Sequence, residues 1–289
     1  MTNEISTNGT GQQEGPIRTP RRVSVSSWAL HNLIGTVAPG RPGDSEARMM
    51  APHTPQEPLD LLHVPGELAK RGITTMELCH FHVPTRDPAY LQEFTRAREE
   101  AGVELWSVLI DDGDLNHPEH AQRDRDWILG WIDTAATLGS KCTRVIAGKQ
   151  EPTEENIAKS REQLLGLMMD AYLRGIHLMT ENWFKTLSKP EYVHQVLEPT
   201  NGSIGLCLDF GNWGGDTKYR DLADIALYAE SCHAKCNFVD GKPDEEDYER
   251  CLRLAVHAGF SGPFTLVYGE PGDVWGSIDT QRELLQPYL

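Results

Sequence analysis

The segment EENIAKSREQLLGLMMDAYLRGIHLMTE (154–181) contains in full the unit that decides the fold. Its first part, 154–174, is an amphipathic stretch of helix length, and Gly175 stands where a helix is expected to stop. The rest, 176–181, is an apolar run of strand length. A helix that passes through one glycine into a buried strand is typical of parallel α/β sheets.

The same alternation continues on both sides of this segment. Two more predicted helices, 60–71 and 88–101, run into Gly72 and Gly102, and a third covers 124–139. Eight strands paired with helices imply a closed sheet, so we predict a single (β/α)8 barrel over residues 21–289. An open doubly wound sheet is the alternative, but no G-x-G-x-x-G motif follows the first strand. The strand candidates are RVSVSSW (22–28), TTMELC (74–79), ELWSVLI (104–110), CTRVIA (142–147), IHLMTE (176–181), SIGLCLD (203–209), SCHAKCN (231–237) and PFTLVYG (263–269).

Composition narrows the class of partners. The chain has 289 residues and a formal net charge of −16, which argues against nucleic acid as a partner. Residues 1–20 have little to bury and are predicted to form a disordered arm. No apolar stretch reaches the length of a membrane span, and the six cysteines form no C-x-x-C pair. We therefore expect a cytoplasmic protein with reduced thiols and no membrane partner.

The longest irregular segment, 35–57, follows the first predicted strand. Loops of this length are often functional lids, and a tolerated surface insertion is an equally good interpretation.

Acidic and histidine residues stand at or near the ends of the predicted strands: Glu77, Glu181, Asp209, His233 and Glu270. In a barrel the carboxyl ends of all strands converge on one face, so these side chains can meet there. Carboxylate and imidazole groups suit Mn²⁺, Mg²⁺ or Zn²⁺. The sequence therefore predicts a metal-dependent enzyme.

Each of these residues also has an ordinary structural interpretation. Glu181 or Asp209 alone would more often cap a helix, and a lone strand histidine such as His233 is usually a hydrogen-bonded core residue. Together they make a plausible set of three ligands on neighbouring strand ends, which leaves positions open for water or substrate.

Two further groups of polar residues lie near predicted strand ends. His80 and His82 alternate in MELCHFHVP (76–84), so in an extended segment they would share one face, as a second ligand group or an acid–base pair. Asp111 belongs to IDDGD (110–114), which lacks the spacing of a calcium-binding EF-hand loop.

At these residues the chain resembles the xylose isomerase-like TIM barrels, specifically the sugar phosphate isomerase/epimerase family. The resemblance covers most of residues 22–289, and the ENW, DFGNW and HAK blocks are its most specific parts. The motifs that carry it are SSWALHNLIG (26–35), MELCHFH (76–82), SVLIDDGD (107–114), RVIAGK (144–149), TENWF (180–184), LDFGNW (208–213), HAKCNF (233–238) and GPFTLVYGEPGDVW (262–275).

The resemblance implies a divalent metal bound by Glu, Asp, His and Glu from the fifth to the eighth strands. Matched motif by motif, Glu181, Asp209 and His233 take the first three places. The last glutamate of the family falls near Val267. Either the site has shifted to Glu270, or water or another side chain completes it.

The resemblance also implies proton abstraction next to a carbonyl, with the metal polarising that carbonyl. Glu181 would act as the base, and the second proton carrier would be His82, Glu270 or Lys235. The residues expected to contact a carbohydrate-like substrate are His31, His80, Asp111, Lys149 and Asn212.

The leading prediction is thus a metal-dependent isomerase or epimerase of a sugar, sugar phosphate or related polyol. A lyase or dehydratase on the same scaffold shares the first chemical step. Hydrolysis of abasic DNA needs more metal ligands, and the acidic charge argues against it. A barrel that has lost catalysis and binds a ligand is the non-enzymatic alternative. Barrels of this kind often pair, so a homo-oligomer is also considered.

Overall fold

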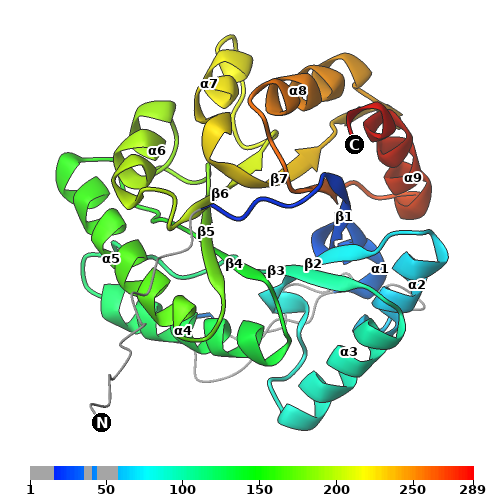
Figure 1. The fold of residues 1–289 in the computed structure, drawn as a ribbon, viewed down its shortest axis with the longest axis horizontal. Helices are drawn as coiled ribbons and strands as arrows, with labels where there is room; N and C mark the ends of the chain where they lie inside the picture. The colour runs from blue at the N-terminus through cyan, green and yellow to red at the C-terminus, as the bar shows by residue number, and fades with distance from the viewer. Residues whose placement is uncertain (1–15, 36–40, 44–57) are drawn as a thin grey trace, which may run out of the picture.

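The computed structural model describes residues 16–35, 41–43 and 58–289, and in it eight parallel strands close into a barrel (Figure 1). Around the barrel the order is β1-β10-β7-β6-β5-β4-β3-β2, which confirms the predicted fold. The barrel strands are β1 (Arg22–Ser26), β2 (Thr75–Cys79), β3 (Glu104–Ile110), β4 (Cys142–Val145), β5 (His177–Glu181), β6 (Gly205–Asp209), β7 (Ala229–Lys235) and β10 (Pro263–Val267).

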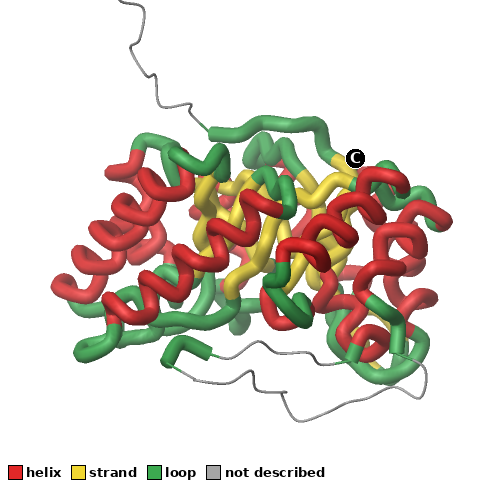
Figure 2. Tube along the Cα trace, turned by 90° about the horizontal axis from the view of Figure 1, so that it is seen from below, coloured by secondary structure: helices red, strands yellow, loops and turns green. Residues whose placement is uncertain are grey.

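Helices surround the strands on all sides, as both views show (Figures 1 and 2). A small antiparallel hairpin of β8 (Phe238–Val239) and β9 (Lys242–Pro243), which the sequence did not predict, follows β7. The helices are α1 (His31–Ile34), α2 (Val64–Lys70), α3 (Pro88–Glu100), α4 (Ala121–Thr137), α5 (Glu154–Tyr172), α6 (Pro190–Leu197), α7 (Lys218–Ile225), α8 (Glu245–His257) and α9 (Val274–Leu285).

Local sequence signals fix the helix ends. The Thr153 side chain accepts a hydrogen bond from the backbone N–H of Asn156 and so caps α5. Gly175 after α5 and Gly102 after α3 have positive φ, +72° and +67°, a conformation that glycine adopts without steric cost. The predicted helix-to-strand transitions therefore occur where the glycines stand.

The interior of the barrel contains buried polar side chains. Side chains alternate along β1, so Val25 packs into the hydrophobic core while Ser24 and Ser26 face the opposite side of the sheet. Glu77 on β2 is fully buried, and its Oε1 accepts a hydrogen bond from Ser231 Oγ on β7 at 2.9 Å. A buried carboxylate needs such partners, because its desolvation is otherwise costly.

Two predictions concern segments that fall largely outside the described residues. Of the predicted disordered arm 1–20, residues 16–20 are described, and Ile17 packs against Trp106, Cys142 and Met179 at the amino-terminal end of the barrel. Of the predicted lid 35–57, Gly35 and residues 41–43 are described, and the rest lies outside. No helix in the described part of the chain is long and apolar enough to cross a membrane. All six cysteines are buried and unbridged.

Candidate active site

A cavity of about 340 Å³ opens at the carboxyl end of the strands. Apolar side chains form part of its wall, among them Trp28, Phe81 and Trp183, and the uncharged polar residues Ser26 and Asn212 also line it beside a group of acidic and basic side chains. These acidic and basic residues are Asp111, Arg144, Glu181, Asp209, His233 and Lys235.

His233 on β7 is the centre of the polar part. Its Nδ1 lies 3.4 Å from Asp209 Oδ2 and 3.8 Å from Glu181 Oε1. Its Nε2 lies 2.8 Å from Glu77 Oε2, across the interior of the barrel. One ring nitrogen is thus held by Glu77, while the other faces the two carboxylates. The sequence prediction that Glu181, Asp209 and His233 can meet is compatible with this arrangement.

The turn after β6 fixes the Asp209 carboxylate. Asp209 Oδ1 accepts hydrogen bonds from the backbone N–H groups of Gly211 at 2.6 Å and Asn212 at 2.8 Å. Gly211 has a second role, since a Cβ there would lie 2.5 Å from Cδ of Lys235. The turn therefore holds Asp209 at the strand end and leaves room for Lys235 beside it.

Glu181 is held by an amide and an ion pair. Asn212 Nδ2 donates to Glu181 Oε1 at 2.6 Å, and Glu181 Oε2 lies 2.8 Å from Nε of Arg144 on β4. Arg144 Nη2 also pairs with Asp111 Oδ1 at 2.5 Å. Sequence reasoning missed Arg144, although an arginine within the apolar run CTRVIA (142–147) signals a buried counter-ion.

The environment shifts the pKa values of the cluster in opposite directions. Burial alone would lower the pKa of His233, but the negative charges around it, including Glu77 and Glu181, hold that pKa well above its ordinary range. Burial alone would raise the pKa of Asp209, but its hydrogen bond with His233 and the Gly211 amide lower it. Each of these shifts favours the charged form of its group.

Three other shifts describe the surroundings of this pair. Burial opposes ionisation of Arg144, but Asp111 and Glu181 outweigh it and raise the pKa of the guanidinium. The same ion pair lowers the pKa of Asp111 against its burial. Burial raises the pKa of the Cys207 thiol to about 12, so the thiol stays protonated.

The histidines of MELCHFHVP lie in a single 3-10 turn, His80–His82, so the extended segment predicted for them is wrong. The backbone N–H of Asp111 donates to His80 Nδ1 at 3.1 Å. His82 Nδ1 lies 2.8 Å from Ser27 Oγ, and its Nε2 lies 3.0 Å from His31 Nδ1. Burial lowers the pKa of His82 to about 3. Neither His80 nor His82 is among the residues that line the cavity.

The remaining predicted residues are spread over the same end of the barrel. His31 stacks on Trp28, a cavity residue, with ring centroids 4.8 Å apart. Lys149 Nζ pairs with Asp112 Oδ1 at 2.6 Å and does not line the cavity. Glu270 is exposed in the loop after β10, and its backbone carbonyl accepts a hydrogen bond from Asn32.

Val267 and Lys235 occupy the last positions of the neighbouring strands β10 and β7. They are register partners, and both line the cavity. The Lys235 ammonium makes no hydrogen bond or ion pair with a described residue. An apolar side chain therefore stands where the resemblance places the fourth ligand, with the Lys235 ammonium beside it.

The donor set fits a divalent cation. Ligand atoms of Glu181, Cys207 and His233 lie within 4.8 Å of one another, and Asp209 Oδ2 lies 3.4 Å from His233 Nδ1. Glu181 Oε2 is buried and has no hydrogen-bond partner among the described residues. Glu77 on the far ring nitrogen corresponds to the outer partner that metal-bound histidines usually have. Glu181, Asp209 and His233 could therefore hold a cation, with Cys207 as a softer alternative.

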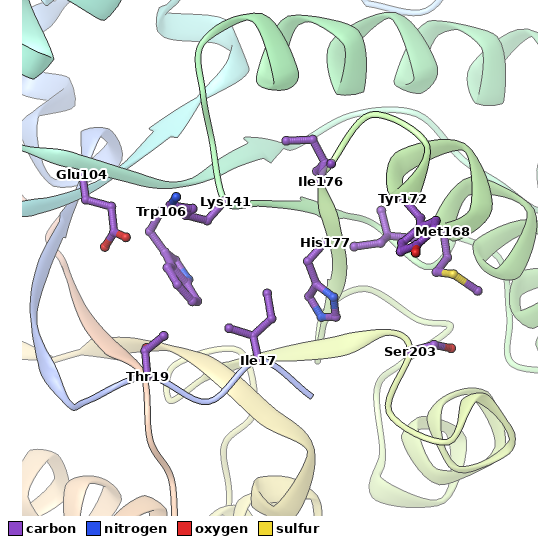
Figure 3. A pocket seen from close by; sticks show the side chains of 12 residues that line it. Ile17, Thr19, Glu104, Trp106, Lys141, Met168, Tyr172, Ile176, His177 and Ser203 are labelled. Atoms are coloured by element: carbon purple, nitrogen blue, oxygen red, sulfur yellow. The ribbon is translucent and has the colours of Figure 1, made fainter. Parts of the chain in front are cut away.

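The amino-terminal end of the barrel has a second cavity, of about 350 Å³, which includes Ile17, Trp106 and His177 in its lining (Figure 3). His177 Nε2 pairs with Glu230 Oε2 at 2.7 Å. Glu230 faces His177 and Glu104 pairs with Arg22, so the described residues of this end show one acid to each base rather than several acids around one ring.

Comparison of the sequence with models of protein families gives a match. The sequence model described as "Xylose isomerase-like TIM barrel" matches residues 66–284. The chain belongs to this family. The xylose isomerase-like assignment confirms the resemblance found from the motifs, and a search of curated proteins finds no match.

Solved structures agree with the xylose isomerase-like fold at low sequence identity. A xylose isomerase-like TIM barrel protein from Mycobacterium smegmatis in complex with magnesium has a TM-score of 0.65 at 15% identity, with 92% of this chain and 96% of that chain covered. A D-allulose 3-epimerase from Methylomonas sp. has a TM-score of 0.66 at 13% identity, with 95% and 99% covered. A D-tagatose 3-epimerase-like protein has 0.62 at 17%, with 92% and 97% covered.

Proposed function

We propose that the protein is a metal-dependent isomerase or epimerase that acts on a sugar, sugar phosphate or related polyol by proton transfer next to a carbonyl. The observation that carries the proposal is the convergence of Glu181 and Asp209 on one nitrogen of His233, with all three residues lining a cavity of about 340 Å³. Epimerases among the structural neighbours support the substrate class.

The cation would be Mn²⁺, Mg²⁺ or Zn²⁺, held by Glu181, Asp209 and His233. When bound, it would supply Lewis-acid polarisation of a substrate oxygen. The residues that orient these ligands belong to the protein itself. Glu77 fixes the His233 ring through Nε2, and the amides of the Asp209 turn fix that carboxylate.

Glu181 is the proposed base that removes the proton beside the carbonyl. Its buried carboxylate lines the cavity, and the Asn212 amide orients it. Of the three proposed second proton carriers, Lys235 lines the cavity, whereas His82 and Glu270 do not. The Lys235 ammonium is therefore the best placed to return a proton or to stabilise a developing oxyanion.

The apolar Val267 favours a lyase or dehydratase as a second candidate. A two-base epimerisation uses acids on both sides of the substrate, and Val267 leaves the eighth strand without one. A dehydration needs one base and one acid, which Glu181 and Lys235 could supply.

The proposal is tested by proton exchange. The metal-loaded protein is incubated in D₂O with ketoses, ketose phosphates and cyclic keto-polyols, and products are followed by NMR and mass spectrometry. Deuterium at the carbon beside the carbonyl, with product mass otherwise unchanged, supports an isomerase or epimerase. Loss of water supports the lyase. No exchange on the whole panel, with the metal bound, counts against both.

A further inference from the structure

Arg144 places a positive charge beside the candidate cation site. The side chain lies on β4 and is 2% exposed. Its guanidinium contacts the Asp111 carboxylate at 2.5 Å, the Glu181 carboxylate at 2.8 Å and the Ile110 carbonyl at 3.4 Å. A buried guanidinium with carboxylates on two sides stays charged, so its charge acts on whatever else binds there.

The contact between Arg144 and Glu181 is close without being a directional hydrogen bond. Arg144 Nε and Glu181 Oε2 lie 2.8 Å apart, yet neither atom has a hydrogen-bond partner among the described residues. The attraction is therefore mainly between charges, and the lone pairs of Oε2 are still available to another cation.

Because Val267 supplies no carboxylate, the contact between Arg144 and Glu181 matters for cation binding. With valine at the end of β10, two carboxylates among the described residues face Nδ1 of His233, those of Glu181 and Asp209. Glu181 is thus half of the negative charge that would attract a divalent cation. Neutralising it with Arg144 removes a large part of that attraction.

We propose that Arg144 competes with the divalent cation for Glu181 and so weakens the metal affinity of this site. The inference deepens the proposed function and rests on it for the identity of the site. Competition is possible because Arg144 contacts two carboxylates. When Glu181 binds the cation instead, Arg144 still has Asp111 as a partner.

The test removes the ion pair without changing the net charge. Arg144→Met combined with Asp111→Asn deletes one positive and one negative charge. Mn²⁺ binding to the metal-free protein is measured by calorimetry and by electron paramagnetic resonance, without substrate. We expect the affinity to rise by on the order of tenfold or more, because Glu181 is then free.

A control removes a more exposed arginine–carboxylate pair at the other end of the barrel. Arg22 and Glu104 pair at 2.5 Å, so Arg22→Met with Glu104→Gln should leave Mn²⁺ affinity unchanged. An equal rise in the control means a general effect of losing a pair and overturns the inference.

The outcomes separate this inference from the proposed function. Wild-type binding with an unchanged affinity in the folded Arg144→Met/Asp111→Asn variant overturns the inference and leaves the function standing. Binding by the variant alone supports the inference and contradicts metal dependence in the natural protein. No binding by either overturns both. Should the variant fail to fold, crystals of the wild type with Mn²⁺ decide: Glu181 should leave Arg144, and an intact contact beside bound Mn²⁺ overturns the competition.

Discussion

The two ends of the barrel bury histidine–carboxylate contacts of similar length in different surroundings. At the amino-terminal end, His177 pairs with Glu230 at 2.7 Å. At the carboxyl-terminal end, His233 contacts Glu77 at 2.8 Å and also faces Asp209 and Glu181. At the amino-terminal end one carboxylate faces one ring, whereas at the carboxyl-terminal end three carboxylates face one ring, and a further cation would balance this excess of negative charge. This agrees with the general division of such barrels into a stabilising face and a functional face.

The largest expected effect is on catalysis and comes from a change at the carboxyl-terminal end of the barrel. Glu181→Gln removes the proposed base while its amide oxygen can still accept from Asn212. Under the proposed function, deuterium incorporation into the substrate should fall by about 10²- to 10⁴-fold. Glu230→Gln is the matched variant at the other end and should stay within a few-fold of wild type. Similar losses in both variants would show that the ends do not differ in function.

The free energy of unfolding should depend more on Glu230, at the amino-terminal end, than on Asp209, at the carboxyl-terminal end. Glu230→Gln removes the carboxylate that contacts the His177 ring, and the free energy of unfolding should drop by about 1–3 kcal/mol. Asp209→Asn should cost less in metal-free protein, because the amide oxygen of asparagine can still accept the hydrogen bonds from the backbone N–H groups of Gly211 and Asn212. Urea unfolding in the presence of a chelator measures both. Equal destabilisation would instead assign Asp209 a mainly structural role.

Two buried histidines at the carboxyl end should respond differently to acid. The pKa of His82 is lowered to about 3 by burial, while that of His233 is raised. Below an unfolded-state pKa of about 6.5, the unfolded chain takes up a proton at His82 that the folded chain does not. The stabilisation from neutral His82 is thus complete above that pH and is lost as the pH falls toward 3.

As the pH falls below 6.5, the free energy of unfolding should decrease more steeply in the wild type than in the His82→Asn variant. Between pH 6.5 and 5, His82 should account for a loss of about 2 kcal/mol in the free energy of unfolding. Chemical unfolding across this range checks it. Parallel pH profiles for the two proteins would contradict a depressed pKa at His82.

Local signals explain which parts of the structure the sequence could predict. Apolar runs that follow helix-ending glycines identify strands in the sequence. Glu181 and Asp209 can be predicted because each stands at the end of such an apolar run. Arg144 was missed because its role depends on the register that brings β3, β4 and β5 side by side. Glu230 was missed because β7 begins at Ala229, two residues before the predicted strand. Partners that lie across the barrel interior, such as Glu77 and His233, leave no trace in sequence spacing.

The smallest expected effect concerns which side chain completes the cation site. Cys207 and Asp209 stand two residues apart on β6, so both face His233. With its pKa raised to about 12, the Cys207 thiol is a neutral and soft group, poorly suited to Mn²⁺ or Mg²⁺. Cys207→Ser should therefore change Mn²⁺ affinity by less than about threefold, whereas Asp209→Asn should lower it by at least about tenfold. Calorimetric titration of both variants measures this difference. If Cys207→Ser lost more affinity than Asp209→Asn, the site would be a thiolate site, and Zn²⁺ would become the better candidate because it tolerates sulfur ligands.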